Sequence, residues 1–185
     1  MQDFFQLEFG LWNLWIGVIL AWLSAAYLAM LSRPALQRLW DMSWYPREDG
    51  KILYGSIVVN VLIVVVSVFI PLKTGSICFH LGFLLYCFGF VVNLFALHDY
   101  GTTPPDRVIT KGLYSLSRNP LYVLWAVMLL GLCVASVSMI FFILWIINNV
   151  VTHWLIQCEE RYCLKTYGDS YADYMSKVPR YFLFF

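Results

Sequence analysis

Long apolar segments alternate with short polar segments along this chain. Leu11 to Leu31 contains no charged residue and is long enough for a helix to cross a hydrocarbon core about 30 Å thick. Ile52 to Leu72 and Ser76 to His98 are two further segments of this kind, joined by a tight turn at Lys73-Thr74-Gly75. The pattern therefore predicts transmembrane helices over residues 11–31, 52–72 and 76–98.

The last apolar block, Pro120 to Gln157, is too long for one crossing, because at about 1.5 Å per residue a single helix would reach about 57 Å. The small polar run Ser136-Val137-Ser138 is the predicted reversal. It divides the block into a helical hairpin with spans at 120–135 and 139–158. The expected fold is an all-α membrane protein with five transmembrane helices, forming one integral membrane domain over residues 1–185.

Basic residues give this fold an orientation. All of the 12 lysines and arginines except Lys73 fall in the three polar segments that the five-span count places on one side. They are Arg33, Arg38, Arg47, Lys51, Arg107, Lys111, Arg118, Arg161, Lys165, Lys177 and Arg180. The positive-inside rule then predicts an N-terminus outside and a C-terminal segment in the cytoplasm.

The composition indicates a membrane protein and argues against a soluble domain, a nucleic-acid partner and a metal site. Of the 185 residues 61% are hydrophobic and only 12% are charged, against about 25% charged in soluble domains. A net charge of +1 gives no argument for nucleic acid as a partner. The five cysteines lack any C-x-x-C spacing and are expected to be small buried apolar side chains. Three scattered histidines do not make a metal site.

Arg118-Asn119-Pro120 marks the start of the hairpin. Asn119 is expected to cap the helix, and Pro120 suits its first position because proline lacks an amide hydrogen. Free amides at this helix start, with Arg118 beside them, could hold an anion. The alternatives are that this is simply a capped membrane helix and that Arg118 meets lipid head groups.

Glu159 and Glu160 close the hairpin. Adjacent side chains on a helix point about 100° apart, so only one of the two can face a given pocket. Asn149, His153, Gln157 and Glu160 follow helical spacing and form one polar stripe, which predicts that Glu160 faces the bundle interior. The alternatives are that both carboxylates balance Arg161 and Lys165 at the interface, and that His153 is a satisfied hydrogen-bonding group.

Together these motifs resemble the superfamily of isoprenylcysteine carboxyl methyltransferases and phospholipid methyltransferases. The resemblance covers residues 75 to 185 approximately. Its motifs are Gly112-Leu113-Tyr114, Arg118-Asn119-Pro120-x-Tyr122, Glu159-Glu160, Tyr167-Gly168-Asp169-x-Tyr171 and Val178-Pro179-Arg180.

The resemblance implies an integral membrane enzyme that uses S-adenosyl-L-methionine, without a metal, on a lipophilic acceptor that arrives through the surrounding membrane lipids. It implies that the cofactor-binding part spans residues 99–185 approximately. The cofactor-binding residues carried over are Val108, Ile109, Tyr114, Arg118, Asn119, Pro120, Tyr122 and Glu160, with Glu159 beside them.

Two differences from the isoprenylcysteine enzymes concern the acceptor of the methyl group. Asn119 stands where the isoprenylcysteine enzymes usually have histidine. Those enzymes also place an arginine about one turn before the acidic pair, where it meets the substrate carboxylate, whereas this chain reads His153-Trp154-Leu155-Ile156-Gln157. The resemblance implies a function like that of the isoprenylcysteine enzymes, but these two differences leave the acceptor open, with phospholipid N-methylation or methylation of a small thiol as alternatives.

The acceptor decides whether a base is needed. A carboxylate is already nucleophilic, whereas an amine or thiol must lose a proton, and His153 or Glu159 would then be the general base. Two readings from other classes stay open at this point. One is a nicotinamide-dependent enzyme related to the sterol reductases, which share an Arg-Asn-Pro-x-Tyr element, and the other is a membrane subunit without enzymatic activity.

Overall fold

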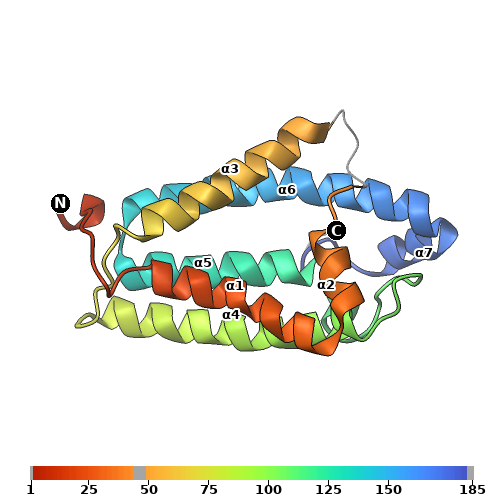
Figure 1. The fold of residues 1–185 in the computed structure, drawn as a ribbon, viewed down its shortest axis with the longest axis horizontal. Helices are drawn as coiled ribbons and strands as arrows, with labels where there is room; N and C mark the ends of the chain where they lie inside the picture. Colours follow the sequence, from red (N-terminus) through yellow and green to blue (C-terminus); the bar gives the residue numbers. More distant parts are fainter. Residues whose placement is uncertain (1, 44–48, 183–185) are drawn as a thin grey trace.

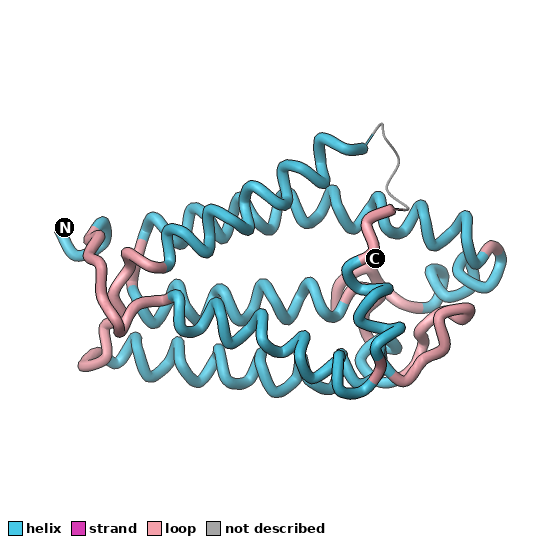
Figure 2. Tube along the Cα trace, viewed as in Figure 1, coloured by secondary structure: helices cyan, strands magenta, loops and turns pink. Residues whose placement is uncertain are grey.

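The computed structural model describes residues 2–43 and 49–182, and within them the chain is entirely helical and turn-connected, with no strand (Figures 1 and 2). Arg47, which the charge pattern includes, lies outside the described residues. The α-helices are α1 (Trp15–Leu31), α2 (Arg33–Trp40), α3 (Gly50–Ser67), α4 (Ile77–Gly101), α5 (Pro120–Ser136), α6 (Met139–Tyr167) and α7 (Asp169–Lys177). Two short 3-10 helices are η1 (Gln2–Phe5) and η3 (Gly112–Ser115).

Five of these helices are apolar along their length. Within the described residues, α3, α4 and α6 are long and apolar enough to cross a membrane, and α1 and α5 are shorter apolar helices. In Figure 1, α3 lies along α6, and α1, α4 and α5 form the other side of the bundle. Their shared core is built from Leu14, Val18, Met128, Leu132 and Phe141, among others.

Two glycines allow α4 and α5 to pack along each other. A Cβ added at Gly82 would overlap the backbone of Gly131 and Ala135, and one added at Gly131 would press on the backbone of Gly82 and Tyr86. Small residues at such crossings let helix backbones approach closely, which is how apolar helices associate in a membrane. The pair therefore fixes where α5 starts relative to the end of α4.

The predicted hairpin is confirmed at its reversal. α5 ends at Ser136, Val137 takes the left-handed conformation with φ 54°, and Ser138 caps α6 by accepting a hydrogen bond from the amide of Phe141 at 3.3 Å. However, α6 continues to Tyr167, well beyond the predicted end at residue 158. Of the five cysteines, which the sequence predicts to be buried, Cys133 and Cys158 are buried, whereas Cys78, Cys87 and Cys163 are only partly buried.

Two predicted spans are shorter than expected for one common reason. Residues 8–14 and 68–72 leave the helical conformation and pair with each other: the amide of Leu14 donates to the carbonyl of Ile70, and that of Leu72 donates to the carbonyl of Trp12. The Asn13 side chain adds a hydrogen bond of 2.7 Å to the carbonyl of Val68. α1 therefore begins at Trp15 and α3 ends at Ser67.

The connections divide between the two ends of the bundle (Figure 1). The N-terminal segment, the α3–α4 turn and the α5–α6 turn lie at one end. α2, the segment between α4 and α5, and α7 lie at the other. The described basic residues other than Lys73 belong to segments at this second end. The candidate site forms here.

Candidate active site

A tight turn aligns the segment that leads into α5. Gly112 has φ +54°, and a Cβ there would overlap the carboxylate of Asp99 at the end of α4. That carboxylate accepts a hydrogen bond from the amide of Leu113 at 3.2 Å. Only glycine combines this φ with this close approach, so Gly112 fixes the path of the chain toward Arg118.

Glu160 is the centre of a buried network of charges. Its Oε1 accepts from Arg118 Nε at 3.0 Å and from Asn119 Nδ2 at 3.1 Å. Its Oε2 accepts from Arg180 Nε at 3.0 Å and from Arg180 Nη2 at 2.8 Å. Glu160 is only 4% exposed, as the polar stripe on α6 predicts. Because a carboxylate has about four lone-pair positions, the protein itself uses all of them.

Arg118 connects this network to the C-terminal segment. Its Nη1 donates to the carbonyls of Met175 and Val178, each at 2.8 Å, and its backbone amide donates to the carbonyl of Pro179. Arg118 is buried and paired, so the alternative that it faces lipid head groups is wrong. The hydrogen bonds that Arg180 makes to Glu160 raise the pKa of its guanidinium and keep it charged.

Asn119 does not cap α5 as the sequence predicts. Its side chain makes no hydrogen bond to the first amides of the helix. Instead Nδ2 donates to Glu160 and to the carbonyl of Arg180 at 3.3 Å. The prediction was wrong because the side chain is turned toward the charged carboxylate of Glu160, which accepts its amide hydrogen. Pro120 does occupy the first turn, as expected.

Glu159 lies on a different face of α6 and has a different environment. Its Oε1 accepts a hydrogen bond of 2.5 Å from the hydroxyl of Tyr122 on α5. Among the described residues it accepts no other hydrogen bond and pairs with no arginine or lysine. The side chain is partly buried. Glu159 therefore keeps unused lone pairs, and the alternative in which the pair jointly balances Arg161 and Lys165 is wrong, since Arg161 pairs with Asp49.

Val108 and Tyr114 lie against α7, and the neighbouring Ile109 is buried. Val108 packs on a cluster of Tyr171, Tyr174 and Val178, and Ile109 is 6% exposed. The hydroxyl of Tyr174 donates to the carbonyl of Tyr114 at 2.6 Å. Burial raises the pKa of the Tyr114 phenol, which therefore stays protonated at neutral pH. These residues form a wall of apolar and aromatic groups beside the charged network.

His153 belongs to a separate cluster. Its Nδ1 lies 2.6 Å from the hydroxyl of Tyr181, and its Nε2 lies 2.7 Å from Nε2 of Gln157, so both ring nitrogens have partners. Within the described part of the chain, no hydrogen bond joins His153 to Glu159 or Glu160. The pairing of His153 with Gln157 does confirm that the two share one face of α6.

Sequence reasoning missed two arginines. Arg180 was noted only as part of the Val178-Pro179-Arg180 motif. Its contact with Glu160 depends on α7 and the turn after it, which bring the chain back to Arg118-Asn119-Pro120, the hinge before α5. Arg38 lies on α2, which the apolar pattern does not reveal because this helix is short and polar. Its Nη2 donates to the hydroxyl of Tyr167 at 2.9 Å.

The donors of this site suit an amino-acid-bearing cofactor such as S-adenosylmethionine. Arg118 and Arg180 together carry one more charge than Glu160 neutralises, which favours a carboxylate. Glu159 has lone pairs available for a cationic group. The wall at Ile109 and Tyr114 is apolar and aromatic, as an adenine face requires.

Comparison with known proteins gives one match. The family model for phospholipid methyltransferase matches residues 73–170, more than half of the 185-residue chain. The match includes the hinge, α5 and the acidic pair, and it leaves out α2 and Arg180. A search of curated proteins and a search of solved structures found no match.

Proposed function

The chain belongs to the phospholipid methyltransferase family, and on this basis we propose that it is an integral membrane enzyme that transfers a methyl group from S-adenosylmethionine to a lipophilic acceptor. The observation that supports the proposal most is the network that joins the hinge to the acidic pair. Arg118 and Glu160 are far apart in the sequence, yet they form a buried ion pair of 3.0 Å inside the matched segment.

Two sets of residues form the proposed cofactor site. Arg118, Asn119 and Glu160, with Arg180, form the polar wall of the cofactor site, and Pro120 sets the start of α5 within it. Val108, Ile109, Tyr114 and Tyr122 form its remaining surface. When bound, S-adenosylmethionine supplies a methyl group on a sulfonium that a nucleophile can attack directly. The protein therefore acts mainly by positioning the acceptor and excluding water.

Glu159 is the proton acceptor that we assign if the acceptor is an amine or a thiol. It has unused lone pairs and a hydrogen bond from Tyr122 that orients it. His153 is less suited, because both of its nitrogens already have partners. An acceptor carboxylate, as in the isoprenylcysteine enzymes, needs no base, and Glu159 would then face a cationic group of the cofactor.

The membrane topology is part of the proposal. Five crossings by α1, α3, α4, α5 and α6 would place the N-terminus outside and the C-terminus in the cytoplasm. One domain would then carry its cofactor-binding part in residues 99–185, at the cytoplasmic end. The gathering of the basic segments at one end of the bundle supports this arrangement (Figure 1).

Calorimetry on the detergent-solubilised chain tests the cofactor. We expect S-adenosylhomocysteine to bind the wild-type protein and Arg161→Ala alike, and binding to be lost in Arg118→Ala and Glu160→Ala. Arg161 is a matched control because it follows Glu160 directly, and its side chain is 53% exposed and pairs only with Asp49 and Cys158 among the described residues. Binding of NADPH in place of S-adenosylhomocysteine would instead support the reductase reading, and binding of neither would support a non-enzymatic subunit.

Transfer of a labelled methyl group identifies the acceptor. The protein is incubated with labelled S-adenosylmethionine and a native lipid extract, a prenylated thioether carboxylate, phosphatidylethanolamine or a small thiol. We expect label in one of these acceptors, and none in the Arg118→Ala protein. If all label stays in the cofactor with every acceptor, the enzymatic proposal fails.

A further inference from the structure

The side chains of the candidate active site are almost entirely buried in this structure. Ile109, Tyr114, Asn119 and Glu160 keep between 4% and 8% of their surface exposed. Ligands of the size of a nucleoside occupy concave spaces of about 300–1,000 Å³ and contact the side chains that line them. A ligand therefore reaches these four residues only after a neighbouring segment has moved.

The hinge before α5 and the segment after α7 are firmly held together. Arg118 donates to the carbonyls of Met175 and Val178, and Arg180 holds the carboxylate of Glu160 with two hydrogen bonds. Moving either segment would separate buried charges from their partners, which is strongly destabilising. The segment that moves is therefore a different one.

Residues 102–111, which connect α4 to η3, are held more loosely. The hydroxyls of Thr102 and Thr103 donate back to carbonyls in the last turn of α4, at 2.7 Å each. Residues 104–107 are exposed, whereas Ile109 is buried and belongs to the candidate site. A movement of this segment would thus uncover part of the candidate site without breaking the Glu160 network.

Both ends of this segment are fixed against other parts of the protein. A Cβ added at Gly101 would lie 2.8 Å from the side chain of Leu28 on α1, and Gly112 has φ +54° where it meets the end of α4. Between these ends, Pro104 and Pro105 restrict the backbone, because the proline ring fixes φ. The segment is therefore expected to move as a unit between two fixed ends.

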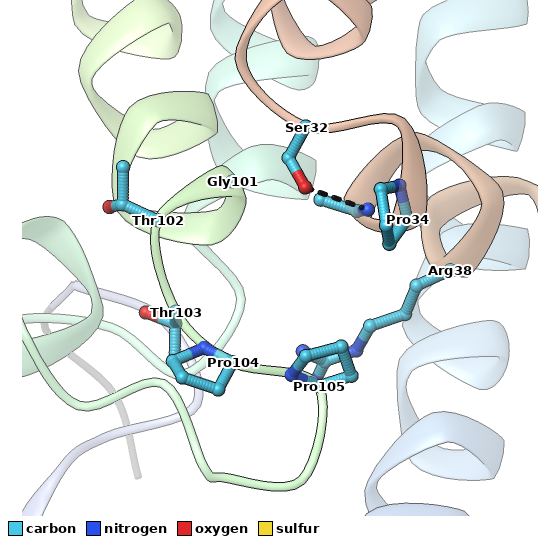
Figure 3. Close-up of a pocket in the computed structure, with 9 residues that line it drawn as sticks. Ser32, Pro34, Arg38, Gly101, Thr102, Thr103, Pro104 and Pro105 are labelled. Atoms are coloured by element: carbon cyan, nitrogen blue, oxygen red, sulfur yellow. Dashed lines mark hydrogen bonds between the residues drawn. The ribbon is translucent and has the colours of Figure 1, made fainter.

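A cavity of about 280 Å³ separates this segment from α2 (Figure 3). Residues 101–105 line one side of the cavity, and residues of α2 and its cap, Ser32 to Arg38, line the other. Well-packed protein interiors have few voids larger than a water molecule. The segment is therefore poorly supported on the side of α2, and it has space there to move into.

One hydroxyl group ties the segment to two helices. Tyr167, the last residue of α6, donates to the carbonyl of Pro105 at 3.0 Å and accepts from Nη2 of Arg38 on α2 at 2.9 Å. The guanidinium of Arg38 also lies 5.1 Å from the centre of the Tyr100 ring, which is a cation–π contact. Figure 3 shows Arg38 reaching from α2 toward Pro105. We call the contact between Arg38, Tyr167 and Pro105 the latch.

The latch also carries a cost. Nη1 of Arg38 is buried and has no hydrogen-bond partner among the described residues. A charged donor that is buried without a partner has lost its hydration, and opening the latch would return it to water. The favourable hydrogen bonds of Tyr167 are thus partly offset. Segments that must open for function have this low local stability.

We propose that residues 102–111 are a lid over the candidate site, held closed by the latch. Opening would lift Val108 from the cluster on α7 against which it packs. The lid and Tyr167 lie within the segment that the family model matches, whereas Arg38 lies outside it, so the latch depends on this chain's own N-terminal part. That the lid admits S-adenosylmethionine rests on the proposed function; the lid itself does not.

Cysteine labelling of the full-length protein in detergent micelles, without ligand, measures opening. In a background without the five native cysteines, Ile109→Cys reports the buried side of the lid. The labelling rate follows the open population when reclosing is faster than the reaction. We expect Tyr167→Phe to raise this rate about tenfold, because it removes both hydrogen bonds of the latch.

Two controls accompany this measurement. Thr110→Cys, at an exposed neighbouring position, should react at the same rate with and without Tyr167→Phe, since it reports the reactivity of an accessible thiol. Tyr54→Phe is the matched substitution, because Tyr54 lies on α3 and is 70% exposed. It should leave the labelling of Ile109→Cys unchanged.

A second substitution separates a latch from general loosening. Arg38→Met removes one hydrogen bond of Tyr167 together with the unpaired Nη1, so it should raise the labelling rate less than Tyr167→Phe does. Added to Tyr167→Phe, it should cause no further increase, because the hydrogen bond that joins the two residues is already absent. Additive effects would show that the two residues act independently, which overturns the latch.

The remaining outcomes also decide the proposal. An unchanged labelling rate in Tyr167→Phe overturns it. If Tyr167→Phe does not fold, hydrogen exchange of the wild-type protein decides instead: the amides of residues 106–111 must exchange before those of α5 and α6, and simultaneous exchange overturns the lid.

The kinetics of S-adenosylhomocysteine connect the lid to the proposed function. A gate changes rates rather than affinity, so Tyr167→Phe should raise the association and dissociation rates about equally and leave Kd unchanged. A loss of affinity without a change in labelling overturns the lid. No binding of S-adenosylhomocysteine, with labelling that still depends on Tyr167, would refute the proposed function and leave this inference standing.

Discussion

At the scale of single residues, Glu159 and Glu160 differ in what surrounds them, although they are adjacent on α6. Glu160 accepts four hydrogen bonds from three side chains, two of them arginines, whereas Glu159 accepts one from Tyr122. A carboxylate whose lone pairs are all used by the protein organises a site. A carboxylate with lone pairs left over is able to meet a ligand or a proton. We therefore expect substitutions of the two residues to have different effects on stability and on catalysis.

The first prediction concerns stability. Glu160→Gln should lower the free energy of unfolding by about 3–5 kcal/mol, because it leaves the buried guanidinium of Arg118 and the partly buried one of Arg180 without a counter-charge. Glu159→Gln should lower it by about 0.5–1.5 kcal/mol, the typical contribution of one hydrogen bond. Unfolding in mixed micelles, followed by tryptophan fluorescence, measures both. Equal effects of the two substitutions would contradict the central role given to Glu160.

The second prediction separates catalysis from binding at Glu159. If Glu159 accepts a proton from the acceptor, Glu159→Gln should lower kcat by about 10²–10⁴-fold. The affinity for S-adenosylhomocysteine should stay unchanged. Tyr122→Phe, which keeps the carboxylate and removes its hydrogen-bond donor, should have a smaller effect on kcat. A fall in S-adenosylhomocysteine affinity that matches the fall in kcat would assign Glu159 to the cofactor instead.

At the scale of elements, the contact between α4 and α5 sets the geometry of the site. Gly82 and Gly131 let the two backbones approach, and the same two helices carry the turn at Asp99 and the start of α5 at Pro120. A wider crossing would shift Arg118 relative to α6. The glycine pair thus links helix packing to the ion pair with Glu160.

The third prediction tests this link. Gly131→Ala should lower the free energy of unfolding by about 1–3 kcal/mol, because its Cβ would lie 2.7 Å from backbone atoms of Gly82 and Tyr86 on α4. It should also weaken S-adenosylhomocysteine binding. Gly55→Ala on α3 is the control, since a Cβ there meets nothing within 4 Å. A fully stable Gly131→Ala protein would show that the contact between α4 and α5 accommodates a larger side chain than the structure implies.

Elements that depend on hydrophobic pattern alone were predictable, and those that depend on the tertiary structure were not. The reversal at Ser136–Ser138 follows from the length of the apolar block. α2 and α7 are short and polar, so no apolar stripe marks them. Asn119 has the sequence signature of a helix cap, but its role depends on Glu160, which only the folded hairpin brings near. The ends of α1 and α3 depend in the same way on the pairing of residues 8–14 with 68–72.

At the scale of the whole molecule, the chain assembles its site by returning three distant segments to one end of the bundle. The hinge before α5, the end of α6 and the residues after α7 meet at Glu160. α2 and the end of α4 lie at the same end of the bundle (Figure 1). The hinge, the end of α6, the residues after α7 and α2 all carry basic residues, so the orientation that the positive-inside rule assigns to them also assigns the side from which a soluble cofactor enters.

The last prediction tests this orientation by cysteine labelling in intact cells. In a background without the five native cysteines, Thr74→Cys should react with a membrane-impermeant maleimide, whereas Thr110→Cys and Ser176→Cys should react only after permeabilisation. All three positions are exposed, so accessibility reports the side of the membrane rather than burial. Because α4 alone separates Thr74 from Thr110, labelling both from the same side would mean that α4 does not cross. The five-crossing topology, and with it the cytoplasmic cofactor site, would then be wrong.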